Sequence, residues 1–248
     1  MIYTDLHAHT VFCDGKDTPE DMILSAIEKG LKTMGLVVHS YLTISPQYSV
    51  KREQEPVFIK TMADLKEKYK DKIKILCGIE KDFYTEACET GYDYTIGSVH
   101  YVKSGDTLYG IDGTYERFEQ AVEAFGGDYY ALAEEYYRLV GDVVEQTDAD
   151  IIGHIDLIVK FNEKKNYFDE NNPRYINAYK KAIDKLVKFG KPFEINTGAI
   201  SRGYRTTPYP SKPVWEYIKE KGGKFILSSD SHAKENIAFE YDKWKNLL

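Results

Sequence analysis

The six histidines of this chain stand in short polar clusters, at the ends of apolar runs and near Asp, Ser or Gly. They are His7, His9, His39, His100, His154 and His232. Imidazole is the most common side-chain ligand for metal ions in proteins. Histidines without a function are usually scattered over solvated helices, so this concentration indicates a multinuclear metal site and metallohydrolase chemistry.

Spacing places two of these histidines beside each other. Alternate residues of a strand project from the same face, so Asp5, His7 and His9 share one side. Two imidazoles can then reach one metal ion, while Asp5 either orients one of them or simply lies at a polar strand end. An HxH pair also arises by chance, and any single histidine can be a core residue bonded to a backbone carbonyl. Four further histidines, together with Glu80 and Asp230, argue against chance here.

Short strands and helices alternate along the chain and must position these residues. Seven apolar or β-branched segments are predicted as strands, at 2–10, 33–40, 74–83, 94–101, 151–158, 192–198 and 224–232. Helical spacing occurs between them, at 18–30, 60–70, 130–146, 174–190 and 213–223. In the first helix Thr18 is suited to the N-cap, Pro19 to the first turn and Gly30 to the end. This alternation predicts a parallel sheet, and seven units favour a single-domain α/β barrel over residues 1–248.

Polar residues follow the C-terminal ends of the predicted strands. They are Glu80, His100, His154, Asn196, Asp230 and His232. In α/β barrels the active site lies at this end, because the loops after the strands meet there. The sequence therefore predicts one site that gathers residues from most of the strands.

Composition indicates a cytoplasmic enzyme that acts on small molecules. The formal net charge of −7 argues against a broad basic surface for nucleic-acid phosphates. Cys13, Cys77 and Cys88 are odd in number and lack CxxC spacing, so neither a disulfide framework nor a thiolate zinc site is expected. The N-terminus lacks the pattern of a signal peptide, and no apolar stretch reaches membrane-spanning length, so no membrane partner is expected.

The motifs HAHT, FCDG, VVHS, GIEKDFY, GSVHY, GHIDL, EINTG and SSDSH resemble, in order and spacing, those of the PHP (polymerase and histidinol phosphatase) family. The resemblance implies a distorted seven-stranded (β/α)7 TIM-like barrel with three metal ions at its C-terminal face. The implied ligands are His7, His9, Glu80 and Asp230 for the first ion, Glu80, His100 and His154 for the second, and Asp14, His39 and His232 for the third. Glu80, Asp230 and His232 are the implied catalytic residues.

Two further features bear on the resemblance. Many family members have histidine where this chain has Asp14, which implies a harder third site with different metal selectivity. The tyrosine-rich segment 112–140 is similar to the histidinol-phosphate phosphatase branch of the family. Its alternative interpretation is an amphipathic helical pair whose Tyr and Leu side chains pack on the barrel.

The implied chemistry is hydrolysis of a phosphomonoester. Two cations roughly 3.5–4 Å apart can bind the phosphate and lower the pKa of a bridging water to about 7, so that hydroxide is available. Glu80 suits the bridge, and the ligands fit zinc, iron or manganese. The expected reaction converts L-histidinol phosphate to L-histidinol and phosphate in histidine biosynthesis. The alternatives are a protein-tyrosine phosphatase or DNA exonuclease of the same family, and a metal-binding module without activity.

Several residues near this face are candidates for binding the substrate. Arg202 and Arg205 lie in the loop after EINTG, where a guanidinium can clamp two phosphate oxygens. Lys160 follows GHIDLIV, although most lysines are merely solvated. Asn196 either binds substrate or caps its strand. Cys13, next to Asp14, is better interpreted as a small residue filling the loop than as a ligand.

Overall fold

Seven parallel strands form the central sheet, in the order in which they occur in the chain. They are β1 (Thr4–Asp5), β2 (Thr33–His39), β3 (Lys74–Asp82), β4 (Tyr94–Ser98), β7 (Ile151–Ile152), β8 (Phe193–Asn196) and β9 (Phe225–Ser228). The coordinates are a computed structural model that describes residues 4–86 and 90–248. Cys88 and the first two residues of the predicted strand 2–10 lie outside these ranges. The strand order is that of a barrel unrolled between its first and last strands.

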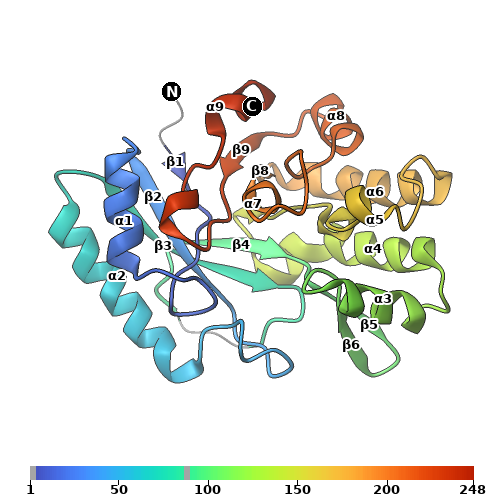
Figure 1. Ribbon diagram of the computed structural model, residues 1–248, viewed down its shortest axis with the longest axis horizontal. Coiled ribbons are helices and arrows are strands. Elements are labelled where there is room, and N and C mark those ends of the chain that lie inside the picture. Colours follow the sequence, from blue (N-terminus) through green and yellow to red (C-terminus); the bar gives the residue numbers. More distant parts are fainter. Residues whose placement is uncertain (1–3, 87–89) are drawn as a thin grey trace.

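The first and last strands lie side by side and close the barrel (Figure 1). A parallel bridge joins Ala8 to Ser231, and the backbone N–H of His9 donates to the Ser231 carbonyl at 2.7 Å. The predicted single-domain, seven-stranded barrel is therefore confirmed. Its strands are shorter than predicted, and in two of them the chain leaves the regular ladder before the polar residues: β7 ends at Ile152, before His154, and β9 ends at Ser228, before Asp230 and His232. Those polar residues are thus free to turn toward the barrel axis.

The five predicted helices are present and pack outside the sheet (Figure 1). They are α1 (Pro19–Glu28), α2 (Glu55–Tyr69), α4 (Tyr129–Thr147), α6 (Pro173–Leu186) and α8 (Lys212–Glu220). Thr18 caps α1 by accepting a hydrogen bond from the Asp21 backbone, as its position predicts. Gly30 follows the helix with a φ of +79°, which glycine adopts without steric cost. Local sequence signals therefore fix the main helices.

Smaller elements lie in the connecting segments and near the C-terminus. They are the antiparallel hairpin β5 (Tyr101–Ser104) and β6 (Thr107–Gly110), and the helices α3 (Tyr115–Ala124), α5 (Asn162–Lys165), α7 (Gly198–Ser201) and α9 (Tyr241–Trp244). Single 3-10 turns add η1 (Arg52–Gln54), η2 (Leu157–Val159), η3 (Val187–Phe189), η4 (Lys234–Asn236) and η5 (Lys245–Leu247). The hairpin is absent from the sequence prediction, and it extends the wall around the strand ends.

The segment 112–140 packs on the barrel as an amphipathic helical pair. Phe118 of α3 is buried, as are Leu132, Tyr136 and Tyr137 of α4, and all four belong to one apolar cluster. The tyrosines of this segment that lie in the core therefore have a packing role, as the helical-pair interpretation expects. A second apolar cluster lies between α1, α2 and the strands β2 and β3.

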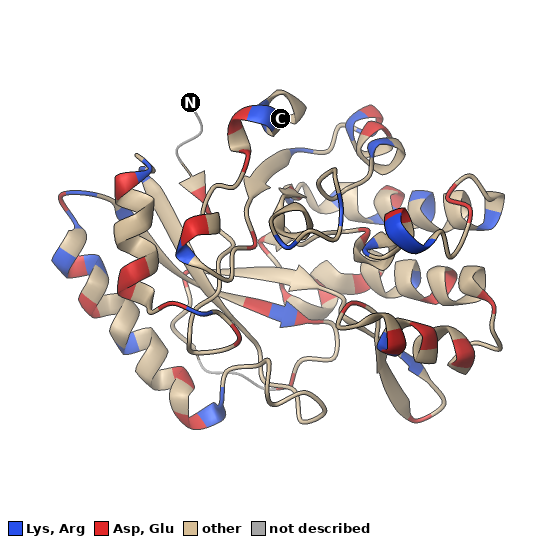
Figure 2. Ribbon diagram, in the orientation of Figure 1, with Lys and Arg blue, Asp and Glu red and all other residues tan. Residues whose placement is uncertain are grey.

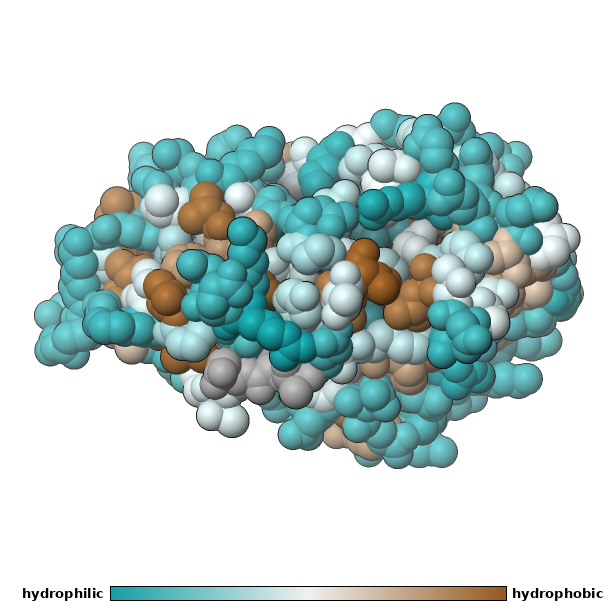
Figure 3. All heavy atoms as spheres, turned by 90° about the horizontal axis from the view of Figure 1, so that it is seen from below, coloured by the Kyte–Doolittle hydropathy of each residue, from teal (hydrophilic) through white to brown (hydrophobic). Residues whose placement is uncertain are grey.

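The surface is mainly polar and carries charges of both signs. Figure 2 shows acidic and basic residues interspersed along the outer helices. Figure 3 shows apolar residues on one face as separate patches within a largely hydrophilic surface. Among the residues described, no helix combines the length and apolar character needed to span a bilayer. Scattered apolar residues of this kind are normal on a folded protein.

Candidate metal centre

The strand ends bring all the predicted metal ligands together around one cavity. Those that line it are Asp14, His39, Glu80, His100, His154, Asp230 and His232. His7 and His9 are fully buried and contact the lining residues Glu80 and Asp230. The ligands come from loops and strands far apart in the chain, so barrel closure is what assembles them.

His7, His9 and Asp230 form one group of possible ligands deep in the barrel. The Nε2 atoms of His7 and His9 are 3.2 Å apart, and the Oδ1 atom of Asp230 lies 3.5 Å from His9 Nε2 and 3.8 Å from His7 Nε2. Glu80 Oε2 lies 3.3 Å from His7 Nε2. The four side chains that the family resemblance implies for the first metal therefore face one another.

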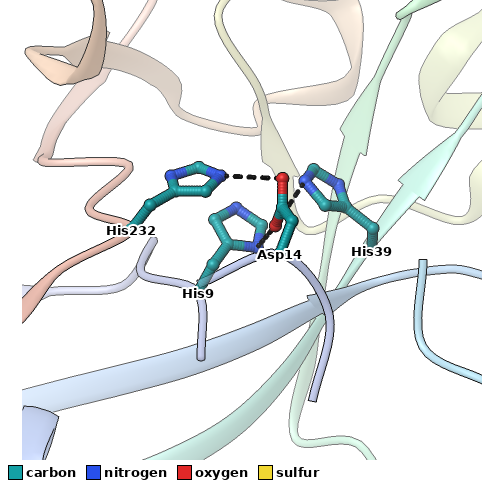
Figure 4. Close-up of side chains that lie close together, drawn as sticks. All are labelled: His9, Asp14, His39 and His232. Carbon is teal, nitrogen blue, oxygen red and sulfur yellow. Dashed lines mark ion pairs between the residues drawn. The ribbon is translucent and has the colours of Figure 1, made fainter. Parts of the chain in front are cut away.

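A second group surrounds Asp14 and is closer to the solvent. Figure 4 shows the rings of His9, His39 and His232 around this carboxylate. Asp14 Oδ2 lies 3.2 Å from His232 Nε2, and Oδ1 lies 3.6 Å from His39 Nε2 and 4.0 Å from His9 Nδ1. The expected third set is thus together, and His9 faces it with its second nitrogen.

Glu80 lies between the groups and contacts histidines from all three expected sets. Oε2 lies 2.9 Å from His39 Nδ1 and also faces His7. Oε1 lies 3.1 Å from His154 Nε2 and 3.5 Å from His100 Nε2. The carboxylate is 1% exposed. Its two oxygens point to different histidine sets, which is the arrangement that a bridging ligand requires.

Burial and charge prepare several of these groups to bind cations. Burial lowers the pKa of His9 to about 3, with a further contribution from His39 and His232, so its imidazole is neutral and has a free lone pair. Although burial works against ionisation, the histidines around Glu80 hold the pKa of its carboxyl well below the ordinary range. Glu80 and Asp82 likewise overcome burial and raise the pKa of His100 to about 10. A cation beside Glu80 would replace that proton.

Unpaired oxygens inside the site fit bound cations. Within the described residues, Glu80 Oε2 and Asp14 Oδ1 are buried without a hydrogen-bond donor of suitable geometry. Buried carboxylate oxygens in proteins are normally satisfied, because an unpaired one costs several kcal/mol. Imidazole nitrogens lie within 4.0 Å of both oxygens. Nitrogen and oxygen ligands without thiolate fit zinc, iron or manganese.

Two of the predicted substrate-binding residues line the cavity. Arg202 donates to Asp230 Oδ2 at 3.0 Å and contacts His232 Nδ1 at 2.8 Å. Lys160 donates to the Asp112 carbonyl at 2.6 Å and lies 4.6 Å above the Tyr204 ring. Both cations line the cavity together with the candidate metal ligands.

The structure does not bring Arg205 and Asn196 to the cavity. Arg205 donates to the Val159 carbonyl at 3.0 Å and contacts Thr207. Asn196 is fully buried, and its Oδ1 accepts from the Gly198 backbone at 2.9 Å. Both side chains use their polar atoms to hold the backbone behind the site, so we assign them a structural role.

Sequence reasoning missed residues that complete the site. Asp82 accepts from the backbone N–H of His100 at 2.7 Å, and Glu194 lies 2.7 Å from His7 Nδ1. Asp112 and Arg117 line the outer part of the cavity. Asp82 and Glu194 stand two residues from Glu80 and Asn196 in their strands, so alternation could have placed them on the same face.

Cys13 contacts the site without the character of a ligand. Its Sγ lies 3.5 Å from His9 Nδ1. Burial, with the nearby Asp14 charge, raises the pKa of this thiol to about 12. Among the described residues, the groups of side chains placed to hold one ion do not include Cys13, which supports its interpretation as a small residue filling the loop.

A family model for the PHP domain matches residues 5–198. The chain belongs to the PHP domain family. Among similar proteins, "Probable histidinol-phosphatase" of Schizosaccharomyces pombe is 29% identical over 98% of this chain and 84% of that protein. "Histidinol-phosphatase" of Bacillus subtilis is 22% identical and is covered to 96%, as is this chain.

Solved structures share the fold over nearly the whole chain. A histidinol phosphate phosphatase of Lactococcus lactis, in complex with zinc, L-histidinol and phosphate, superposes with a TM-score of 0.74 at 22% identity, over 99% of this chain and 92% of that one. A candidate histidinol phosphatase of Listeria monocytogenes gives a TM-score of 0.85, also at 22% identity, over 97% and 99% of the two chains. At this level of identity the likeness demonstrates the barrel fold.

Proposed function

We propose that this protein is a metal-dependent phosphatase that hydrolyses L-histidinol phosphate to L-histidinol and phosphate in histidine biosynthesis. The observation that carries the proposal is the position of Glu80, with each oxygen facing different histidines on the floor of a cavity lined by Arg202 and Lys160. The similar proteins named histidinol-phosphatase support the choice of substrate. The alignment with the Bacillus subtilis protein covers 96% of both chains, which supports one catalytic domain over residues 1–248.

The residues would divide into three metal sites and a phosphate site. His7, His9, Glu80 and Asp230 hold the first ion, Glu80, His100 and His154 the second, and Asp14, His39 and His232 the third. Bound divalent cations supply activated water and neutralise charge on the phosphate oxygens. Glu80 would hold two of the cations, and Asp230 and His232, which Arg202 contacts, would complete the ligand sets. The nitrogen and oxygen ligands of this chain are compatible with zinc, iron or manganese.

Arg202 and Lys160 would bind and orient the phosphate. Their cationic groups line the cavity beside the ligand groups, and Arg202 presents a planar pair of donors suited to two phosphate oxygens. The Arg202 side chain is anchored by Asp230, so its position is set before substrate arrives. The net charge of −7 favours a small substrate over nucleic acid and, with the cysteine pattern, a cytoplasmic location.

We predict that Arg202→Ala lowers kcat/KM for histidinol phosphate by about 10- to 100-fold, because a hydrogen bond to a charged group contributes about 1.5–3 kcal/mol. Steady-state phosphate release, with metal content measured on the same samples, tests this. Arg174 is exposed and pairs with Glu134 on the outer helices, so Arg174→Ala is the matched control and should behave as wild type. Equal kinetics of both variants would remove Arg202 from the phosphate site.

A panel of phosphate esters tests the proposed reaction. Metal-loaded protein is assayed for phosphate release from histidinol phosphate and a phosphotyrosine peptide, and for degradation of single-stranded DNA. We expect kcat/KM for histidinol phosphate to exceed that for the peptide by at least about 100-fold, as sites that bind substrate polar groups specifically achieve. A preference for the peptide or for DNA would contradict the proposal and assign the activity to another PHP enzyme. Absence of all three activities would indicate a metal-binding module.

A further inference from the structure

The carboxylate of Glu194 connects two expected metal ligands that belong to different sites. Glu194 is in β8 and is 1% exposed. Its Oε1 lies 2.7 Å from His7 Nδ1, and its Oε2 accepts from the backbone N–H of His154 at 3.0 Å. His7 follows β1 and His154 follows β7, so one side chain spans the barrel interior between two strand ends.

The contact with His7 selects which of its nitrogens can bind a metal. An ionised carboxylate only accepts hydrogen bonds, so Nδ1 of His7 must carry the proton. When the ring is neutral, as metal binding requires, its lone pair is then on Nε2. Nε2 is the atom that faces His9 and Glu80, at 3.2 and 3.3 Å. Glu194 therefore both orients the ring and sets its tautomer for coordination.

The contact with His154 replaces a missing ladder bond. Regular pairing of β7 stops at Ile152, and the next N–H, that of Gly153, donates to Gly97 in β4. The N–H of His154 has turned inward and donates to Glu194 instead. This bond fixes the backbone from which the His154 ring reaches Glu80 Oε1, at 3.1 Å.

We propose that Glu194 is a positioning residue that holds His7 for the first metal site and His154 for the second, so that a single buried carboxylate sets the geometry of both. The inference rests on the proposed metal centre and adds a residue to it. It requires a group that accepts on both oxygens, because Oε1 meets the imidazole N–H while Oε2 meets the His154 N–H and the Asn196 amide at 3.2 Å. Glutamine matches the shape but has a single acceptor oxygen.

Glu194→Gln should therefore bind metal more weakly at two sites while keeping the fold. Loss of a partner that orients a metal ligand typically lowers affinity 10- to 100-fold. We expect a loss of this size for two zinc equivalents in competition with a chromophoric chelator, whereas the equivalent held by Asp14, His39 and His232 is retained. Cobalt substitution gives a second measurement, because the visible absorption of the two weakened sites should change in position or intensity. Circular dichroism checks the fold.

Asp156→Asn is the matched control. Asp156 is also a fully buried carboxylate, and it accepts from the Ser211 backbone at 2.7 Å rather than from a metal-ligand residue. The control should bind zinc as wild type does. Wild-type zinc affinity in folded Glu194→Gln, or an equal loss in Asp156→Asn, would overturn the proposal.

A measurement on the unmodified protein covers the case in which Glu194→Gln does not fold. Nitrogen-15 NMR of histidine-labelled, zinc-loaded protein reports which ring nitrogen of His7 carries a proton, with the signal assigned by comparison with His7→Asn. Protonated Nδ1 is the expected result. A proton-free Nδ1 would refute the proposed contact. None of these measurements uses substrate, so their outcome is independent of whether the protein prefers histidinol phosphate.

Discussion

Replacing Glu80 by glutamine is expected to lower kcat by at least about three orders of magnitude, the largest effect of any single substitution in the site. Among the carboxylates of the described residues, Glu80 alone contacts histidines from all three expected ligand sets. Glutamine keeps the shape but removes the charge that holds two cations, and it turns an amide N–H₂ toward imidazole nitrogens. Activation of water by metal contributes several kcal/mol, and each ~1.4 kcal/mol is tenfold in rate.

The comparison with Asp14→Asn separates a bridging role from ordinary coordination. The histidines that Asp14 contacts are His9, His39 and His232, the second group of possible ligands. Its substitution should therefore weaken one metal site and lower kcat less than Glu80→Gln does. Both variants are assayed by steady-state phosphate release, with metal content and circular dichroism measured on the same samples. If Glu80→Gln keeps wild-type metal content and more than about a tenth of the activity, a loss below ~1.4 kcal/mol, Glu80 is not a bridge.

The barrel and its main helices follow from signals that are local in the sequence. Period-two and helical patterns, with caps such as Thr18, mark each element independently of the others. The hairpin β5–β6 was missed because its residues, 101–110, alternate weakly and carry only one buried strand residue, Val102. Its place is fixed by contacts with α3 and α4, which no local pattern contains.

The ligand residues were predictable because topology alone brings strand ends together. The way in which His9 and His39 each face two carboxylates was not predictable, since it depends on side-chain rotation. His39 turns Nδ1 to Glu80 and Nε2 to Asp14, and His9 faces both Asp14 and Asp230. No sequence spacing specifies which ring nitrogen meets which carboxylate.

The directions of the Arg202 and Arg205 side chains are likewise not specified by the sequence. They are three residues apart in one loop. Arg202 ends the short helix α7 and points to Asp230, whereas the turn at Gly203, with a φ of +71°, redirects Arg205 toward the Val159 carbonyl. The sequence predicts a basic loop at the site, and the backbone turn decides which guanidinium enters it.

Removal of the metals is expected to abolish activity and to lower thermal stability without unfolding the barrel. The ligands project from strand ends, and the apolar clusters beneath the helices do not depend on them, so secondary structure should persist. Binding at 1,000 times Kd stabilises the folded state by about 4 kcal/mol per independent site, and this contribution disappears on chelation. Some buried imidazoles beside the carboxylates then take up protons, because the charges of Glu194 and Glu80 overcome burial and raise the pKa values of His7 and His100. Elemental analysis should find more than one metal equivalent in untreated protein, and exhaustive chelation should lower phosphate release by more than about 1,000-fold, a loss of ~4 kcal/mol in transition-state stabilisation.

Zinc, iron or manganese added back separately should restore phosphate release and so identify the active metal. Buffer exchange without chelator is the control. Full activity in demetallated protein would contradict the metallohydrolase assignment, whatever the substrate.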